Sequence, residues 1–117
     1  MMISISRISK SLSVITLALA GLVSSSAFAF DAETAEALAR QNSCFKCHSI
    51  ERKKDGTAYR DVAAKYKDQA DAEQRLITHL TTGPTVKFRD GHEEDHRIIK
   101  TKDADEVRNV VQWILSL

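Results

Sequence analysis

Apolar residues recur every three or four positions in three stretches beyond residue 50, which is the spacing of an amphipathic helix. The first stretch covers residues 57–67, the second covers residues 71–82, and the third begins near Asp103. Gly83 and Pro84 follow the second stretch directly, and this pair is typical of a helix end. The pattern therefore predicts three helices in this part of the chain.

A further helix is predicted over residues 31–43, where the sequence AETAEALAR is rich in helix formers. Asp31 is placed to cap its N-terminus, because a carboxylate there accepts hydrogen bonds from free backbone N–H groups. Ala35 and Ala39 share one face of this helix. Small residues on one face let a second helix approach closely, so we expect an all-helical fold in which this helix packs against another.

Residues 83–102 show no clear periodicity, although they include the apolar residues Val86, Phe88, Ile98 and Ile99. A segment of this length is long for a connection in a small domain, and such segments are usually functional or disordered. We expect part of it to be buried and part of it to carry function.

The first 29 residues have the features of a secretory signal. Arg7 and Lys10 precede a short apolar run over residues 12–23, and Ala27 and Ala29 supply the small residues of a cleavage site. The apolar run is too short to span a bilayer comfortably. We expect cleavage after Ala29, with residues 30–117 as the mature domain; the alternative is an uncleaved membrane anchor.

The net charge of the whole chain is +1, and the predicted leader holds two basic residues and no acidic ones. The mature domain is therefore close to neutral, which argues against a nucleic-acid binder. A domain of this size is near the limit at which its own core is sufficient. A bound apolar group would supply part of the missing contact.

The sequence NSCFKCH, residues 42–48, contains the pattern Cys44-x-x-Cys47-His48, the attachment signature of a c-type haem. The chain has no other cysteine. An exported pair of cysteines can also form a disulfide or act as a redox dithiol, but no strand pattern precedes Cys44. The spacing does not match a closed structural zinc site. The histidine directly after Cys47 favours haem.

With this motif, the chain resembles the small monohaem class I c-type cytochromes. The segment AYRDVAAKYK resembles the family's helix on the histidine side of the haem, and VQWIL resembles its last helix. The resemblance implies an all-α, class I cytochrome c-like fold, with about four helices wrapped around one covalently attached haem c. It also implies that Cys44 and Cys47 form thioethers to the haem and that His48 is the proximal iron ligand.

The chain departs from this family at the second axial ligand. Most members supply a methionine from the loop before the last helix, but Met1 and Met2 are the only methionines here and both lie in the predicted leader. A histidine, a lysine or an open position remains. Neutral imidazole is a good iron ligand, and it lowers the haem potential relative to methionine.

We expect His96 to be the distal ligand, because it lies seven residues before Asp103, close to the place of the family's methionine. His92 is the second choice, in the same irregular segment. His79 lies within a predicted helix, where we expect a surface or partly packed side chain.

The proximal histidine needs an acceptor for its other ring N–H, which in the family is often a proline carbonyl. The only proline here is Pro84, and residues 55–58 occupy the usual position without one. A backbone carbonyl there remains available. Basic residues near the motif either steer an acidic partner or form an ordinary solvated loop; they are Lys46, Arg52, Lys53 and Lys54. The acidic residues 93–95 leave the same choice open for a basic partner.

These features predict a periplasmic protein that carries single electrons and is not an enzyme. Its partners are expected to be redox proteins, with peripheral contact to membrane redox complexes and no nucleic acid. Two alternatives remain: a haem-based gas sensor or ligand-binding protein, and a small haem subunit of a larger oxidoreductase.

Overall fold

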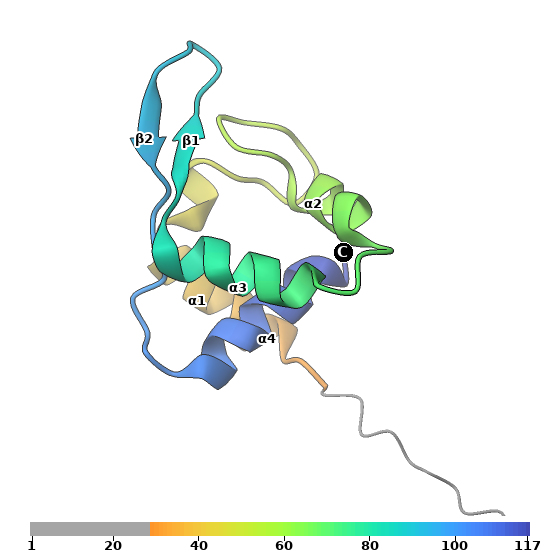
Figure 1. Cartoon of the computed structure of the whole chain (residues 1–117). Coiled ribbons are helices and arrows are strands. Elements are labelled where there is room, and N and C mark those ends of the chain that lie inside the picture. Colours follow the sequence, from red (N-terminus) through yellow and green to blue (C-terminus); the bar gives the residue numbers. More distant parts are fainter. Residues whose placement is uncertain (1–28) are drawn as a thin grey trace, which may run out of the picture.

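The computed structural model describes residues 29–117, so the predicted leader, apart from its last residue, lies outside the described residues. Four helices form the domain: α1 (Ala32–Gln41), α2 (Tyr59–Tyr66), α3 (Ala72–Thr82) and α4 (Ala104–Leu115) (Figure 1). A short 3₁₀ helix, η1 (Cys44–Lys46), follows α1. The predicted all-helical fold is confirmed. Within residues 29–117, no helix has both the length and the apolar character needed to span a bilayer.

The helix ends follow the sequence signals. The side chain of Asp31 accepts a hydrogen bond from the N–H of Thr34 at 3.1 Å, and Asp103 caps α4 through the N–H of Asp105 at 2.9 Å. Such caps satisfy backbone donors that have no partner inside the helix. Gly83 ends α3 in the left-handed conformation, with φ of 61°.

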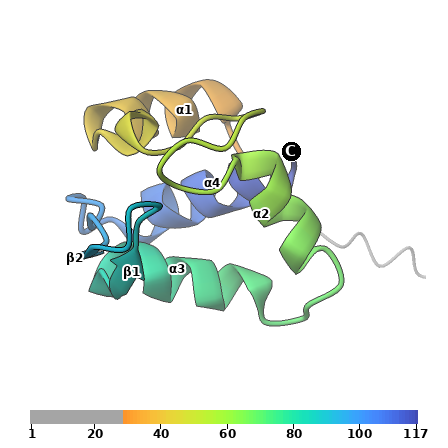
Figure 2. The same ribbon diagram turned by 90° about the horizontal axis from the view of Figure 1, so that it is seen from above.

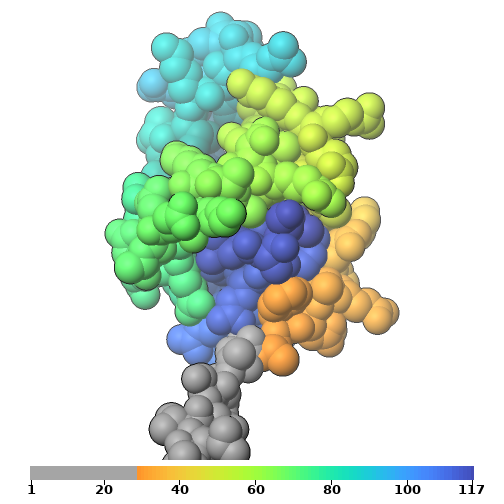
Figure 3. All heavy atoms as spheres, turned by 90° about the vertical axis from the view of Figure 1, so that its right-hand side faces the viewer, coloured from red at the N-terminus to blue at the C-terminus, as the bar shows by residue number. Residues whose placement is uncertain are grey.

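Helix α4 is the centre of the core, because it packs against α1, α2 and α3. Seen from above, α4 lies between α1 and α3 (Figure 2), and in the space-filling view its C-terminal part sits between the α1 and α2 segments (Figure 3). Ala35 and Ala39 of α1 have no exposed surface, which confirms the close helix contact expected from small residues. The apolar face of α4 is buried through Val107, Val110, Val111, Trp113 and Ile114.

Residues 83–102 contain a feature that the sequence did not predict. Strands β1 (Thr85–Lys87) and β2 (Glu93–Asp95) pair as an antiparallel hairpin, with Val86 opposite Glu94. Strands of three residues that are mostly exposed leave no alternating pattern to detect. The hairpin projects from the helices (Figure 1).

The chain after the hairpin is fastened to the helices by backbone groups. The N–H of Ile99 donates to the carbonyl of Leu80 at 2.9 Å, and the N–H of Lys100 donates to Oδ1 of Asn42 at 2.8 Å. Asn42 is itself buried and donates from Nδ2 to the carbonyl of Leu38 at 2.8 Å. Asn42 therefore joins the end of α1 to the segment that follows His96.

Candidate functional site

The attachment motif forms a tight turn after α1. Ser43 adopts a φ of +62°, and the N–H of His48 then donates to the carbonyl of Cys44 at 3.0 Å. This turn therefore holds the backbone of Cys44, Cys47 and His48 close together. Both cysteine side chains are half-buried.

The orientation of the His48 ring is set by one hydrogen bond. Its Nδ1 lies 2.6 Å from the carbonyl oxygen of Thr57, which can only accept, so Nδ1 carries the proton. In the neutral ring this tautomer leaves Nε2 without a proton and available as a ligand. Thr57 lies within residues 55–58, where the sequence left the acceptor unassigned.

Gly56 is part of the same arrangement. A Cβ at position 56 would lie 2.6 Å from Cε1 of His48, closer than packed atoms allow. The N–H of Gly56 also donates to the carbonyl of Cys47 at 2.7 Å. The imidazole therefore rests directly against backbone.

An aromatic cluster supports His48 from another side. The Tyr59 ring stacks on the imidazole with centroids 5.0 Å apart and planes 19° apart. Phe45 and Trp113 meet Tyr59 edge-on, with centroid distances of 5.8 and 5.6 Å. Tyr59 is 5% exposed, and burial raises the pKa of its hydroxyl. Packing on several sides leaves His48 little freedom to rotate.

His96 is brought opposite His48 by the end of α3. The two imidazole centroids are 6.0 Å apart, with planes 53° apart. The N–H of His96 donates to the carbonyl of Pro84 at 2.9 Å. A Cβ at Gly83 would lie 2.5 Å from the carbonyl oxygen of His96, so only glycine permits this close approach. The two residues predicted as axial ligands therefore face one another.

The environment of His96 favours neutral imidazole. Burial is the main cause that lowers the pKa of His96 to about 4, and the neighbouring histidines His79 and His48 add to it. The neutral ring is the form that binds metals. Nδ1 of His96 is buried and has no hydrogen-bond partner, which is not the case for Nε2 of the same ring.

His92, the second choice for the distal ligand, lies at the hairpin turn. Its ring stacks on Phe88 with centroids 4.4 Å apart, and it interacts with the carboxylates of Asp90 and Glu94. The hydrogen bond to Asp90 raises the pKa of His92. All of these partners belong to the hairpin.

His79 is closer to the site than the sequence indicated. Its ring centroid lies 4.2 Å from that of His96, and the side chain is half-buried on α3. Burial is the main cause that lowers the pKa of His79, and His48 adds to it. The helical pattern predicted a surface or partly packed side chain for His79. It could not predict that this face of the helix contacts His96, because the pattern carries no information on contacts with a distant loop.

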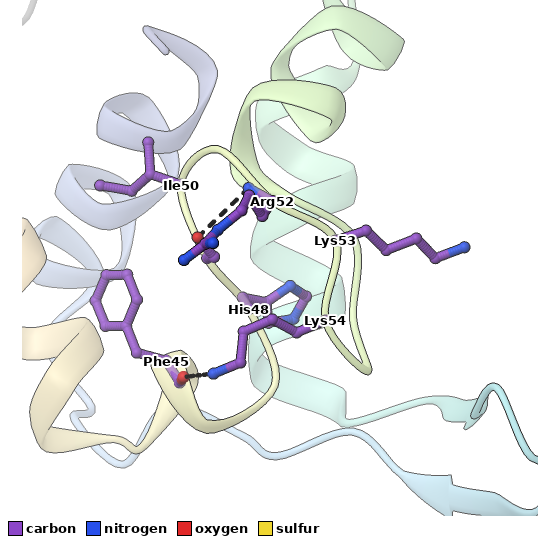
Figure 4. A pocket seen from close by; sticks show the side chains of 7 residues that line it. Phe45, His48, Ile50, Arg52, Lys53 and Lys54 are labelled. Carbon is purple, nitrogen blue, oxygen red and sulfur yellow. Dashed lines mark hydrogen bonds between the residues drawn. The ribbon is translucent and has the colours of Figure 1, made fainter.

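A cavity of about 560 Å³ opens beside His48, between η1 and the loop that follows the motif (Figure 4). It is lined by Phe45, His48, Ser49, Ile50, Arg52, Lys53 and Lys54. Lys54 reaches across and donates from Nζ to the carbonyl of Phe45 at 2.7 Å, whereas Lys53 points away from His48 (Figure 4). Three of the four basic residues noted in the sequence therefore line this cavity.

Comparison with known proteins identifies the family. The profile of the family described as Cytochrome c matches residues 32–117. The crystal structure of the class 1 cytochrome MtoD from Sideroxydans lithotrophicus superposes with a TM-score of 0.73 at 50% identity, covering 75% of this chain and 97% of that one. Cytochrome c-551 of Allochromatium vinosum is 34% identical over 80 residues, which are 68% of this chain and 82% of that protein.

A second solved structure, cytochrome c552 of Nitrosomonas europaea, gives a TM-score of 0.55 at 28% identity, covering 69% of this chain and 96% of that one. The sequence motif, the helical fold and these relatives agree. The chain belongs to the cytochrome c family: it is a small class I cytochrome that carries one covalently attached haem c and transfers electrons.

Proposed function

We propose that this cytochrome is a periplasmic electron carrier with two histidines as its axial iron ligands. Cys44 and Cys47 hold the haem through thioether bonds, His48 binds one face of the iron, and His96 binds the other. The haem supplies one-electron chemistry by alternating between ferric and ferrous iron. The protein supplies a closed coordination shell and a fixed orientation of both imidazoles.

The separation of His48 and His96 carries this proposal. A metal bonded to one nitrogen of each ring at about 2 Å would hold the two centroids about 6 Å apart, and the centroid distance is 6.0 Å. No group of three or more His, Cys, Asp or Glu side chains within residues 29–117 is arranged to hold a metal ion. Two facing histidines suit iron whose other four ligands come from a porphyrin.

The hydrogen bond of His48 supports its role as the proximal ligand. Its N–H at Nδ1 points to the Thr57 carbonyl, 2.6 Å away, which fixes the tautomer and leaves Nε2 for the iron. An acceptor of this kind orients a ligand histidine and raises its basicity. Tyr59 and Gly56 hold the same ring on its remaining sides.

The identity of the second ligand determines the redox behaviour. A thioether opposite histidine raises the haem potential, whereas a second imidazole donates more electron density and favours ferric iron. We therefore expect a midpoint potential below that of relatives with histidine and methionine ligands. The redox partners are then matched to a lower potential.

Export is proposed from the sequence of residues 1–29. If the leader is removed outside the cytoplasm, the mature domain, with haem attached to Cys44 and Cys47, lies in the periplasm. Mass spectrometry of the protein purified from a periplasmic fraction tests this step. We expect Phe30 as the first residue and a mass increase of one haem, whereas an intact leader in a membrane fraction would support the anchored alternative.

Carbon monoxide tests whether the iron is closed. We expect the reduced, haem-loaded protein to have a low-spin six-coordinate spectrum that does not respond to carbon monoxide. Rapid binding of carbon monoxide would mean that the sixth position is open or weakly held. That result would contradict the carrier with two histidine ligands and favour a gas-binding protein.

A further inference from the structure

We propose that His79 is a reserve distal ligand, which binds the iron when His96 leaves it. This proposal rests on the proposed function, because it takes His96 as the resident ligand. It adds a second histidine to the distal face. The exchange breaks one iron–imidazole bond and forms another, so no electron or proton is required.

The position of the two rings supports this role. The centroids of His79 and His96 are 4.2 Å apart, and those of His96 and His48 are 6.0 Å apart. The iron proposed between His48 and His96 would therefore lie within reach of the His79 ring, since rotation about χ1 and χ2 moves an imidazole by several ångströms.

The two histidines stand on elements of different stability. His79 lies in the last turn of α3, which packs against α4 in the core. His96 follows directly on β2, whose residues are all exposed and which pairs only with β1. An isolated two-stranded hairpin is only marginally stable. After His96, single hydrogen bonds from Ile99 to Leu80 and from Lys100 to Asn42 hold the chain, rather than a continuous helical ladder. The segment that carries His96 is therefore expected to open before α3 does.

A reserve ligand has a defined consequence for an electron carrier. When the hairpin opens and takes His96 away, His79 closes the distal face again with the same type of ligand. The iron stays six-coordinate and is not exposed to small molecules that bind ferrous haem. The protein then keeps its single-electron function through an opening that would otherwise create a ligand-binding site.

Four haem-loaded proteins test the proposal: wild type, His79→Ala, His96→Ala and the double variant. The ferric spin state and the rate of carbon monoxide binding to the reduced protein are measured for each. Haem content and thermal unfolding show that each variant is folded. His96→Ala combined with His92→Ala is the matched control for rescue by another hairpin histidine.

We expect His79→Ala to remain low-spin and closed like the wild type. His96→Ala should also remain mainly low-spin. It should bind carbon monoxide at least tenfold more slowly than the double variant that lacks both His79 and His96, which should be high-spin and open. Removing His92 as well should not open the His96→Ala protein.

Two results would overturn the inference. One is a His96→Ala protein that is as open as the variant lacking both His79 and His96. His96 would then still be the distal ligand, but His79 would have no role as a reserve ligand. The other is a double variant that stays closed, which would mean that His79 is not needed. A different result, opening by His79→Ala alone, would contradict the proposed assignment of His96 and make His79 the resident ligand.

Discussion

The imidazole rings of His48 and His96 face one another with centroids 6.0 Å apart, although the two residues are far apart in the sequence. Each of these two residues has a glycine close against it. Gly56 contacts the His48 ring, and Gly83 contacts the carbonyl of His96. The facing pair is therefore built from two separate turns, and each turn can be tested by substitution.

His96→Met should raise the midpoint potential of the haem. A thioether favours ferrous iron more than imidazole does, and axial ligands as a whole span roughly 0.8 V. The shift is measured by potentiometric titration of the haem-loaded variant. His92→Met is the matched control, because it adds the same side chain at the hairpin turn. Equal potentials in the two variants would show that His96 does not bind the iron.

Gly56→Ala should disturb the proximal ligand. The added methyl group would lie 2.6 Å from Cε1 of His48, and overpacking of this kind costs about 1–3 kcal/mol of unfolding free energy. Urea unfolding measures the loss, and the Soret spectrum reports the altered His48 position.

Gly91→Ala is the control for this substitution. Its Cβ would meet nothing within 4 Å, although the φ of +92° also strains an alanine. Its stability should fall through backbone strain alone, with the haem spectrum unchanged. An unchanged spectrum in Gly56→Ala as well would mean that the proximal ring does not rest on Gly56 in the haem-loaded protein.

Asn42→Ala should destabilise the domain by about 1–3 kcal/mol, because it removes a buried amide and leaves the part-buried N–H of Lys100 without its acceptor. Its side chain joins Lys100 to the carbonyl of Leu38. Gln41→Ala changes an exposed neighbour and should alter stability by no more than about 0.5 kcal/mol. Chemical denaturation compares the two variants. Equal losses would show that the Asn42 bridge contributes nothing.

His92 should titrate above the ordinary pKa of histidine, chiefly because it is hydrogen-bonded to Asp90. Since the folded-state pKa is the higher one, its stabilising contribution is fully present below the unfolded-state pKa. That contribution is lost as the pH rises through the folded-state pKa. Both side chains are exposed, so added salt should weaken the effect.

NMR titration of the reduced protein measures this pKa through the ring protons of His92. Asp90→Asn should lower the pKa toward the ordinary value. Glu93→Gln, which removes a neighbouring carboxylate outside the hydrogen-bonded group, should lower it less. A pKa that responds equally to both substitutions would indicate general charge rather than the specific contact.

The helices and their ends could be predicted because each signal is local. Asp31 caps the first helix as predicted, and the last helix begins next to Asp103, where the pattern placed its start. The hairpin could not be predicted, since three-residue exposed strands leave no periodicity. The predicted end of the first helix, at residue 43, was also two residues too far along the chain, because residues 42–43 form a turn before η1.

Sequence predicts candidate site residues where chemistry fixes their spacing, but it does not predict contacts between residues that are distant in the sequence. The motif gave Cys44, Cys47 and His48 together. His96 was inferred from its distance to the last helix and from the lack of methionine after the leader. The neighbouring position of His79 depends on how the end of α3 meets the segment after the hairpin. The Thr57 acceptor depends on the path of a loop without regular structure.

The most direct test of the proposed coordination is the near-infrared magnetic circular dichroism spectrum of the ferric, haem-loaded wild-type protein. This spectrum distinguishes two nitrogen ligands from other axial pairs. We expect the low-spin charge-transfer band of two neutral imidazoles. A high-spin band, or a low-spin band of any other ligand pair, would contradict axial ligation by two histidines.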